Sequence, residues 1–189
     1  HVSPPTPLSN VGAYLLQGEI RPEAIFKTID VATANNIPVI FNNAPVLPIS
    51  QRYRAGIDVL IVNEHEASMM ADSDVNDRSS AELASMVLSE HGYGVVVITL
   101  GAAGIVWSCG GDTFFQPAFI VNQVDTTAAG DTFCGAFAAR FVAGDSLTDA
   151  MHYASAAAAL STLTMGAQTS IPGDDAIVGY LASKPLMYG

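Results

Sequence analysis

Two aspartates enclose a short loop of small residues in the stretch VDTTAAGDTF, which begins at Val124. An apolar run, FIVNQV, precedes this stretch, and a helix-like run, FCGAFAARFVAG, follows it. The first amide groups of a helix have no partner inside the helix, and the helix dipole adds partial positive charge there. Because Ala128, Ala129 and Gly130 carry little or no side chain, a phosphate group could lie against bare amides. The stretch therefore predicts an anion site at the start of a helix.

Asp131 follows this loop, where the start of the helix favours an ionised carboxylate. An ionised carboxylate beside a phosphate is electrostatically costly unless it has a task. Accepting the proton of an attacking hydroxyl is such a task. In the structural alternative, Asp125 or Thr127 caps the helix and Asp131 only offsets the dipole. The pattern alone leaves both interpretations open.

Three other segments have ordinary structural explanations. Asn63 and Glu66, in NEHE, have the spacing of a helix capping box. The glycines of TLGAAG, Gly101 and Gly104, suit a turn between two strands. The run SAAAALSTLTMGAQTSIP, which begins at Ser155, contains the small residues of a closely packed helix. None of these segments indicates a function on its own.

The stretch DTTAAGDTFCGAFAA resembles the C-terminal signature of the ribokinase family, the PfkB family of carbohydrate kinases. The resemblance implies that Ala128, Ala129 and Gly130 line an anion hole for the transferring phosphoryl group, and that Asp131 is the catalytic base. Many relatives carry Gly at the position of Ala128, and we expect a first helical turn to accept either residue. The other motifs follow in the family's order from residue 11 to residue 172.

The resemblance also implies roles for residues outside the anion hole. The implied contacts of ATP are Asn63, Thr99, Gly101, Gly104, Gly130 and Ser155, the last beside the adenine. Glu66 is implied to help organise Mg²⁺ through water. The implied ligands of a monovalent cation, usually K⁺, are Asp125, Thr127, Ser161, Thr164, Gly166 and Ser170. Glu19, which could otherwise be a solvated strand end, is implied to contact the sugar together with Asp131, and FNNAP (residues 41–45) is expected to be structural.

The implied activity is ATP-dependent phosphorylation of a sugar. The segment GAQTS favours ribokinase activity, which converts D-ribose to D-ribose 5-phosphate. Fructokinase and adenosine kinase activities are alternatives within the family, and a non-catalytic nucleotide-binding fragment is the alternative from another class. A homodimer of the complete protein also stays open.

The family's lid and its N-terminal sugar-binding segment have no counterpart in this sequence. We therefore expect residues 1–189 to form one partial ribokinase-like domain, which holds the nucleotide half of the site. On its own, such a chain should be inactive or weakly active.

Alternating strand-like and helix-like runs must position these motifs. The apolar patterns predict strands at 11–17, 37–42, 57–62, 94–99 and 119–124, and a hairpin over 104–109 and 113–117. Helices are predicted at 22–36, 64–71, 79–91, 131–143, 147–165 and 174–183. Strands separated by helices imply right-handed crossovers and a mainly parallel sheet covered on both faces. This α/β pattern agrees with the three-layer α/β/α fold that the resemblance implies.

Composition excludes several classes of protein. The chain has 189 residues, of which 50% are hydrophobic, and 18 acidic against 7 basic residues give a net charge of −11. This charge disfavours binding to nucleic acid or to a membrane surface. No apolar run is long enough to span a bilayer. The two cysteines match no metal-binding spacing, and a reducing, cytoplasmic setting is the simpler interpretation.

Overall fold

The computed structural model describes residues 10–184, and the chain divides into two compact units at the Pro117–Ala118 boundary. The first, the sheet unit, contains the strands β1 (Tyr14–Gln17), β2 (Val39–Asn42), β3 (Val59–Asn63), β4 (Val95–Thr99), β5 (Gly104–Cys109) and β6 (Asp112–Pro117). Its helices are α1 (Pro22–Asn35), α2 (Gln51–Arg54), α3 (Glu64–Ala71), α4 (Arg78–Glu90) and the 3₁₀ turn η1 (Gly101–Ala103). The second, the helical unit, contains α5 (Ala129–Ala143), α6 (Leu147–Ser161) and α7 (Asp174–Ser183).

The six strands form one sheet in the order of the sequence. Strands β1 to β4 pair in parallel, and β5 and β6 continue the sheet as an antiparallel hairpin. Helices connect the parallel strands, as the alternating pattern predicts. The prediction of an α/β protein with a mainly parallel sheet is therefore confirmed.

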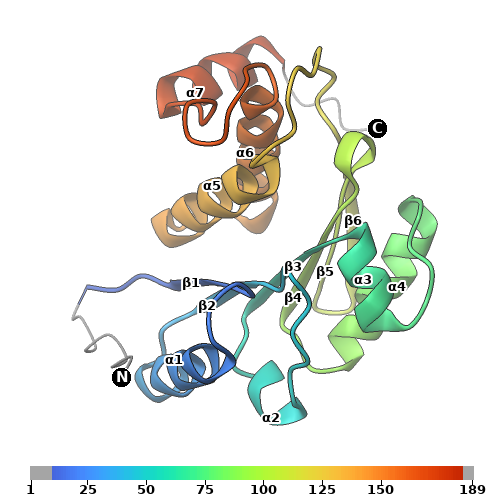
Figure 1. The fold of residues 1–189 in the computed structure, drawn as a ribbon, viewed down its shortest axis with the longest axis vertical. Helices are drawn as coiled ribbons and strands as arrows, with labels where there is room; N and C mark the ends of the chain where they lie inside the picture. Colours follow the sequence, from blue (N-terminus) through green and yellow to red (C-terminus); the bar gives the residue numbers. More distant parts are fainter. Residues whose placement is uncertain (1–9, 185–189) are drawn as a thin grey trace. The chain divides into compact units, whose positions relative to one another are not determined.

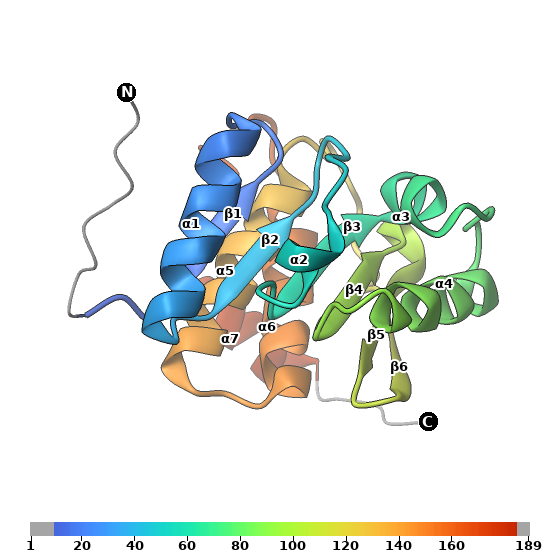
Figure 2. The same ribbon diagram turned by 90° about the horizontal axis from the view of Figure 1, so that it is seen from below.

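Helices α1 to α4 cover one face of the sheet (Figure 1 and Figure 2). The core under them is built from alternate strand residues, such as Phe41, Leu60 and Val96, and from helix residues such as Ile25 and Leu88. The intervening strand residues, which point to the opposite face, are apolar as well: Ile40, Ile61, Val97 and Trp107. Apolar residues on both faces are typical of parallel strands that are buried on both sides.

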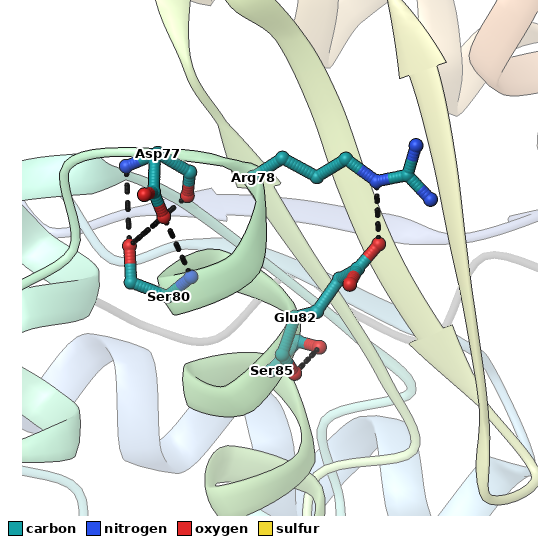
Figure 3. A network of polar contacts seen from close by, with 5 residues as sticks. All are labelled: Asp77, Arg78, Ser80, Glu82 and Ser85. Atoms are coloured by element: carbon teal, nitrogen blue, oxygen red, sulfur yellow. Dashed lines mark hydrogen bonds and ion pairs between the residues drawn. The ribbon is translucent and has the colours of Figure 1, made fainter.

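A polar network fixes the start of α4 (Figure 3). Asp77 accepts a hydrogen bond from the Ser80 amide at 2.8 Å, and the Ser80 hydroxyl lies 3.1 Å from the Asp77 amide, which completes a capping box. One residue further on, Arg78 pairs with Glu82 at 2.7 Å. The Arg78 guanidinium also lies over the Phe115 ring, 4.5 Å from its centroid, which ties α4 to β6.

The predicted strand at 119–124 does not form. The segment is irregular, and the side chains of Ile120 and Val124 are 96% and 62% exposed. The amides of Val124 and Asp125 both donate to the Thr162 carbonyl, at 2.7 and 3.1 Å, and not to a neighbouring strand. An apolar run becomes a strand only where a partner offers a ladder of hydrogen bonds, and this run meets the end of a helix.

Helix α6 ends at Ser161, four residues before the predicted end. Thr162 is its C-cap, and the Thr162 carbonyl is occupied by the two amides from residues 124 and 125. Gly166 then takes a left-handed conformation, with φ 100°. The short helix α2 and the turn η1 were not predicted, because helices of one turn leave little periodicity in a sequence.

Two findings bear on the predictions from composition, one on membrane spans and one on the cysteines. Within residues 10–184, no helix is both long and apolar enough to cross a membrane. Cys109 and Cys134 are both free thiols.

Candidate active site

The loop before α5 leaves a backbone amide available at the start of that helix. The Ala129 amide donates to the Thr126 carbonyl at 3.2 Å, and the Thr132 amide donates to the Ala128 carbonyl at 2.9 Å. The Gly130 amide, between them, donates to no acceptor in the described part of the chain, and Gly130 is exposed. A helix N-terminus with an available amide is the local structure that binds anions.

Gly130 is not required by packing. A Cβ atom built at this position would have no neighbour within 4 Å. The space beside the Gly130 Cα atom is therefore open, and the fold would tolerate an alanine there. Asp131, the next residue, is exposed in the first turn of α5.

Ala128 lies outside the helix, which corrects the expectation that it belongs to the first helical turn. It is the N-cap of α5 and takes a left-handed conformation, with φ 60°. This conformation costs a non-glycine residue about 1 kcal/mol, and glycine adopts it without that cost. Replacement of the family's common Gly by Ala therefore has a conformational cost at this position.

Asp125 links the loop to the segment that follows α6. One carboxylate oxygen accepts from the Thr127 amide at 2.9 Å, and the other accepts from the Gly166 amide at 3.0 Å, across 41 positions of sequence. These hydrogen bonds, the one from Gly166 first, lower the pKa of Asp125 to about 2. The carboxylate is therefore ionised at any physiological pH. No side chain caps α5, so the alternative in which Asp125 or Thr127 caps this helix is wrong.

The other residues implied as cation ligands make no hydrogen bond to Asp125 among the described residues. The Ser161 hydroxyl is buried and donates to the Ala158 carbonyl at 2.8 Å, and the buried Ser170 hydroxyl donates to the Ala167 carbonyl at 3.0 Å. Thr164 is exposed. Hydrogen bonds thus bring together Asp125, Thr127 and Gly166, whereas the hydroxyls of Ser161 and Ser170 each donate to a carbonyl three residues earlier. Among residues 10–184, no three His, Cys, Asp or Glu side chains are arranged to hold a metal.

Helix α6 carries buried polar atoms without partners. The Ser155 hydroxyl is buried and has no hydrogen-bond partner among the described residues, and the same holds for Nδ1 of His152, one turn earlier. Burial lowers the pKa of His152. The His152 ring lies 5.1 Å from the Phe119 ring, centroid to centroid. Buried polar atoms of this kind need a partner that the described residues do not supply, such as water or a ligand. His152 was not predicted as a site residue. Its position three residues before Ser155 places both side chains on one face of a helix and could have indicated it.

In the sheet unit, the predicted residues lie at the carboxyl ends of the parallel strands. Asn63, the last residue of β3, is opposite Thr99, the last residue of β4. Gly101 begins the turn η1 and Gly104 begins β5, with positive φ angles of 51° and 124° that favour glycine. The carboxyl edge of a parallel sheet is where α/β proteins bind ligands. The structure therefore brings together Asn63, Thr99 and the two glycines.

Asn63 and Glu66 form the capping box that their spacing predicts. The Glu66 amide donates to the Asn63 side chain at 2.9 Å, and the Asn63 amide donates to Oε2 of Glu66 at 2.8 Å. Burial raises the pKa of Glu66 more than the hydrogen bond from Asn63 lowers it. The cap uses one carboxylate oxygen and leaves Oε1 for water or a ligand, so a second role for Glu66 is compatible with it.

Glu19 and Asn43 have different environments. Glu19 is exposed in the turn after β1. Asn43 is fully buried, where it accepts from the Leu47 amide at 2.8 Å and donates to the Leu47 carbonyl at 3.1 Å. These contacts support the structural interpretation of FNNAP.

A mainly parallel sheet with polar carboxyl ends, and a helix that begins at a small-residue loop, are features of α/β proteins that bind phosphate groups. A family model described as pfkB family carbohydrate kinase matches residues 7–174. The chain therefore belongs to the pfkB family of carbohydrate kinases.

Similar proteins support this assignment. The ribokinase of Haemophilus influenzae is 37% identical over 158 residues, which cover 84% of this chain and 52% of that protein. The structure of Arabidopsis thaliana ribokinase complexed with ribose and ATP has a TM-score of 0.84 and 30% identity, and the match covers 90% of this chain and 55% of that one. A putative ribokinase II from E. coli in complex with ATP and Mg²⁺ has a TM-score of 0.73, and the match covers 91% of this chain and 59% of that one. Its identity of 21% shows a shared fold only. The chain spans about half the length of the curated relatives it matches.

Proposed function

We propose that the gene product containing this chain transfers the γ-phosphoryl group of ATP to a hydroxyl group of D-ribose, giving D-ribose 5-phosphate and ADP. The observation that carries this proposal is the exposed start of α5, where Gly130, with its available amide, is followed directly by Asp131. The names of similar proteins, ribokinase in one case and a complex with ribose and ATP in another, favour ribose as the sugar.

Asp131 would accept the proton of the sugar hydroxyl. The oxygen then forms a bond to the γ-phosphorus, and the bond from that phosphorus to the bridging oxygen of ADP breaks. Charge on the transferring group faces the Gly130 amide and the positive end of the α5 dipole. Ala128 and Ala129 keep the approach to this amide free of long side chains.

Ser155 and the strand-end residues would hold the nucleotide. The unpartnered Ser155 hydroxyl fits a hydrogen bond to a purine. Asn63, Thr99, Gly101 and Gly104 would contact the phosphates and ribose of ATP at the carboxyl edge of the sheet. Glu66 has one carboxylate oxygen available for a water ligand of Mg²⁺, whose chemical contribution is to neutralise phosphate charge.

A monovalent cation, K⁺ above all, would be held near the loop by Asp125, Thr127, Ser161, Thr164, Gly166 and Ser170. Both Asp125 oxygens already accept backbone amides, so backbone carbonyls of these segments would supply most of the oxygen ligands. Such a cation contributes positive charge and order next to the anion site.

A coupled assay of ADP formation by the full-length gene product tests the proposal. The acceptors are D-ribose, 2-deoxy-D-ribose, D-fructose and adenosine, with Mg²⁺ and with KCl or NaCl at equal ionic strength. We expect the highest kcat/KM with ribose and a higher rate in KCl. A preference for fructose or adenosine would replace ribose as the substrate, and equal rates in both salts would remove the cation site. No ADP formation with any acceptor would contradict the kinase proposal itself.

A further inference from the structure

The connection between α6 and α7, residues 162–173, has no fully buried apolar side chain. Met165 and Ile171 are 77% and 54% exposed, and the buried residues of the connection are the polar Thr162 and Ser170. Figure 1 shows the connection as a long loop between the two helices. Segments with few buried apolar contacts are those that open most easily, so polar contacts must hold this one in place.

The first half of the connection, which follows α6, has such polar contacts. The Gly166 amide donates to Asp125, and the Thr162 carbonyl accepts the amides of Val124 and Asp125. These bonds hold the first half of the connection to the loop before α5. They leave the second half, up to the start of α7, without support from the α5 loop.

The rear of the connection is held by Tyr153 of α6. Its hydroxyl donates to Oδ1 of Asp174, the first residue of α7, at 2.6 Å. The Arg140 guanidinium of α5 lies over the Tyr153 ring, 5.0 Å from its centroid, and Arg140 pairs with Asp145 at 2.6 Å. Burial first, and then Asp174, raise the pKa of Tyr153 to about 12, so the phenol stays a hydrogen-bond donor at physiological pH.

We propose that Tyr153 is a positioning residue, whose hydrogen bond to Asp174 fixes the rear end of the α6–α7 connection and with it the oxygen atoms that the connection offers to a monovalent cation. The cation part of this inference rests on the proposed function. The tether itself stands on the contacts between α6, α7 and Arg140. Ile177, which is 3% exposed in the core with Ala156 and Ala157, anchors the body of α7 but not its first residue.

The experiment compares four variants of the full-length gene product. Tyr153→Phe removes the donor, and Asp174→Ala removes the acceptor. Asp174→Asn keeps an oxygen acceptor and should retain the bond. Tyr180→Phe is the matched control, because the Tyr180 hydroxyl of α7 makes no hydrogen bond in the described part of the chain. Two quantities are measured: hydrogen exchange of the amides in residues 162–173, and the K⁺ concentration that gives half-maximal activation.

Tyr153→Phe and Asp174→Ala should each speed amide exchange in the connection and raise the half-activating K⁺ concentration by about fivefold, the scale of one solvent-accessible hydrogen bond to a carboxylate. The maximal rate at saturating K⁺ should be unchanged, and Asp174→Asn and Tyr180→Phe should behave as the wild type. Unchanged exchange in Tyr153→Phe overturns the tether, whatever K⁺ does. If the wild type does not respond to K⁺, the cation part of the proposed function fails, and amide exchange alone decides the tether.

Discussion

Asp131→Asn should lower kcat for sugar phosphorylation by at least about a hundredfold in the full-length gene product, because loss of a general base typically has this effect. Asparagine has nearly the same shape as aspartate but cannot take the proton of the attacking hydroxyl. The KM for ATP should change little, since the proposed nucleotide contacts lie on other residues. Steady-state kinetics with ribose and ATP measure both quantities.

Asp149→Asn is the matched control for this substitution. Asp149 is the third residue of α6, as Asp131 is of α5, and it accepts a hydrogen bond from the Ser146 hydroxyl at 2.6 Å. Both substitutions remove a negative charge from the first turn of a helix, which costs about 0.3–1 kcal/mol of stability. Only Asp131 directly follows the loop of the proposed anion site, so only Asp131→Asn should affect kcat. Near-normal turnover by Asp131→Asn would remove Asp131 from the mechanism.

Gly130→Ala should lower kcat without lowering the free energy of unfolding. The added methyl group has no protein neighbour within 4 Å, so it would lie in the space where a phosphoryl group must approach the amide. Weakening an anion-hole donor typically costs about tenfold or more in kcat. Alanine favours a helix by about 0.5–1 kcal/mol over glycine, so the free energy of unfolding should be unchanged or higher. Kinetics and denaturant unfolding measure the two effects.

Gly135→Ala provides the comparison within the same helix. Gly135 is exposed in the middle of α5, and a Cβ there also meets nothing within 4 Å. This variant should gain similar stability and keep full activity. If Gly130→Ala is as active as Gly135→Ala, then the space in front of the Gly130 amide has no part in phosphoryl transfer.

Local signals in the sequence were sufficient for several elements. Helices α3 and α7 have the predicted bounds, 64–71 and 174–183. In α3 the cause is local, because Asn63 and Glu66 form the capping box at its start. The adjacency of Asn63 and Thr99 could also be inferred from the sequence, because parallel strands bring their carboxyl ends to one edge of a sheet.

Two of the errors have a common physical origin in a contact between distant segments. The Thr162 carbonyl accepts two amides from residues 124 and 125, and this one contact accounts for both the missing strand at 119–124 and the early end of α6. The bond from Gly166 to Asp125 also joins residues far apart in sequence. Composition and periodicity carry no information about such pairs, although the family resemblance assigned both residues to one cation site.

The most direct test of the account is a crystal structure of the full-length gene product with ADP, Mg²⁺, ribose and aluminium fluoride, which mimics the phosphoryl group in transfer. We expect the fluoride group to lie about 3 Å from the Gly130 amide, the distance of an anion-hole hydrogen bond. We also expect a ribose hydroxyl to contact the Asp131 carboxylate. A fluoride group bound away from the start of α5, or a ribose hydroxyl that contacts a different base, would contradict it.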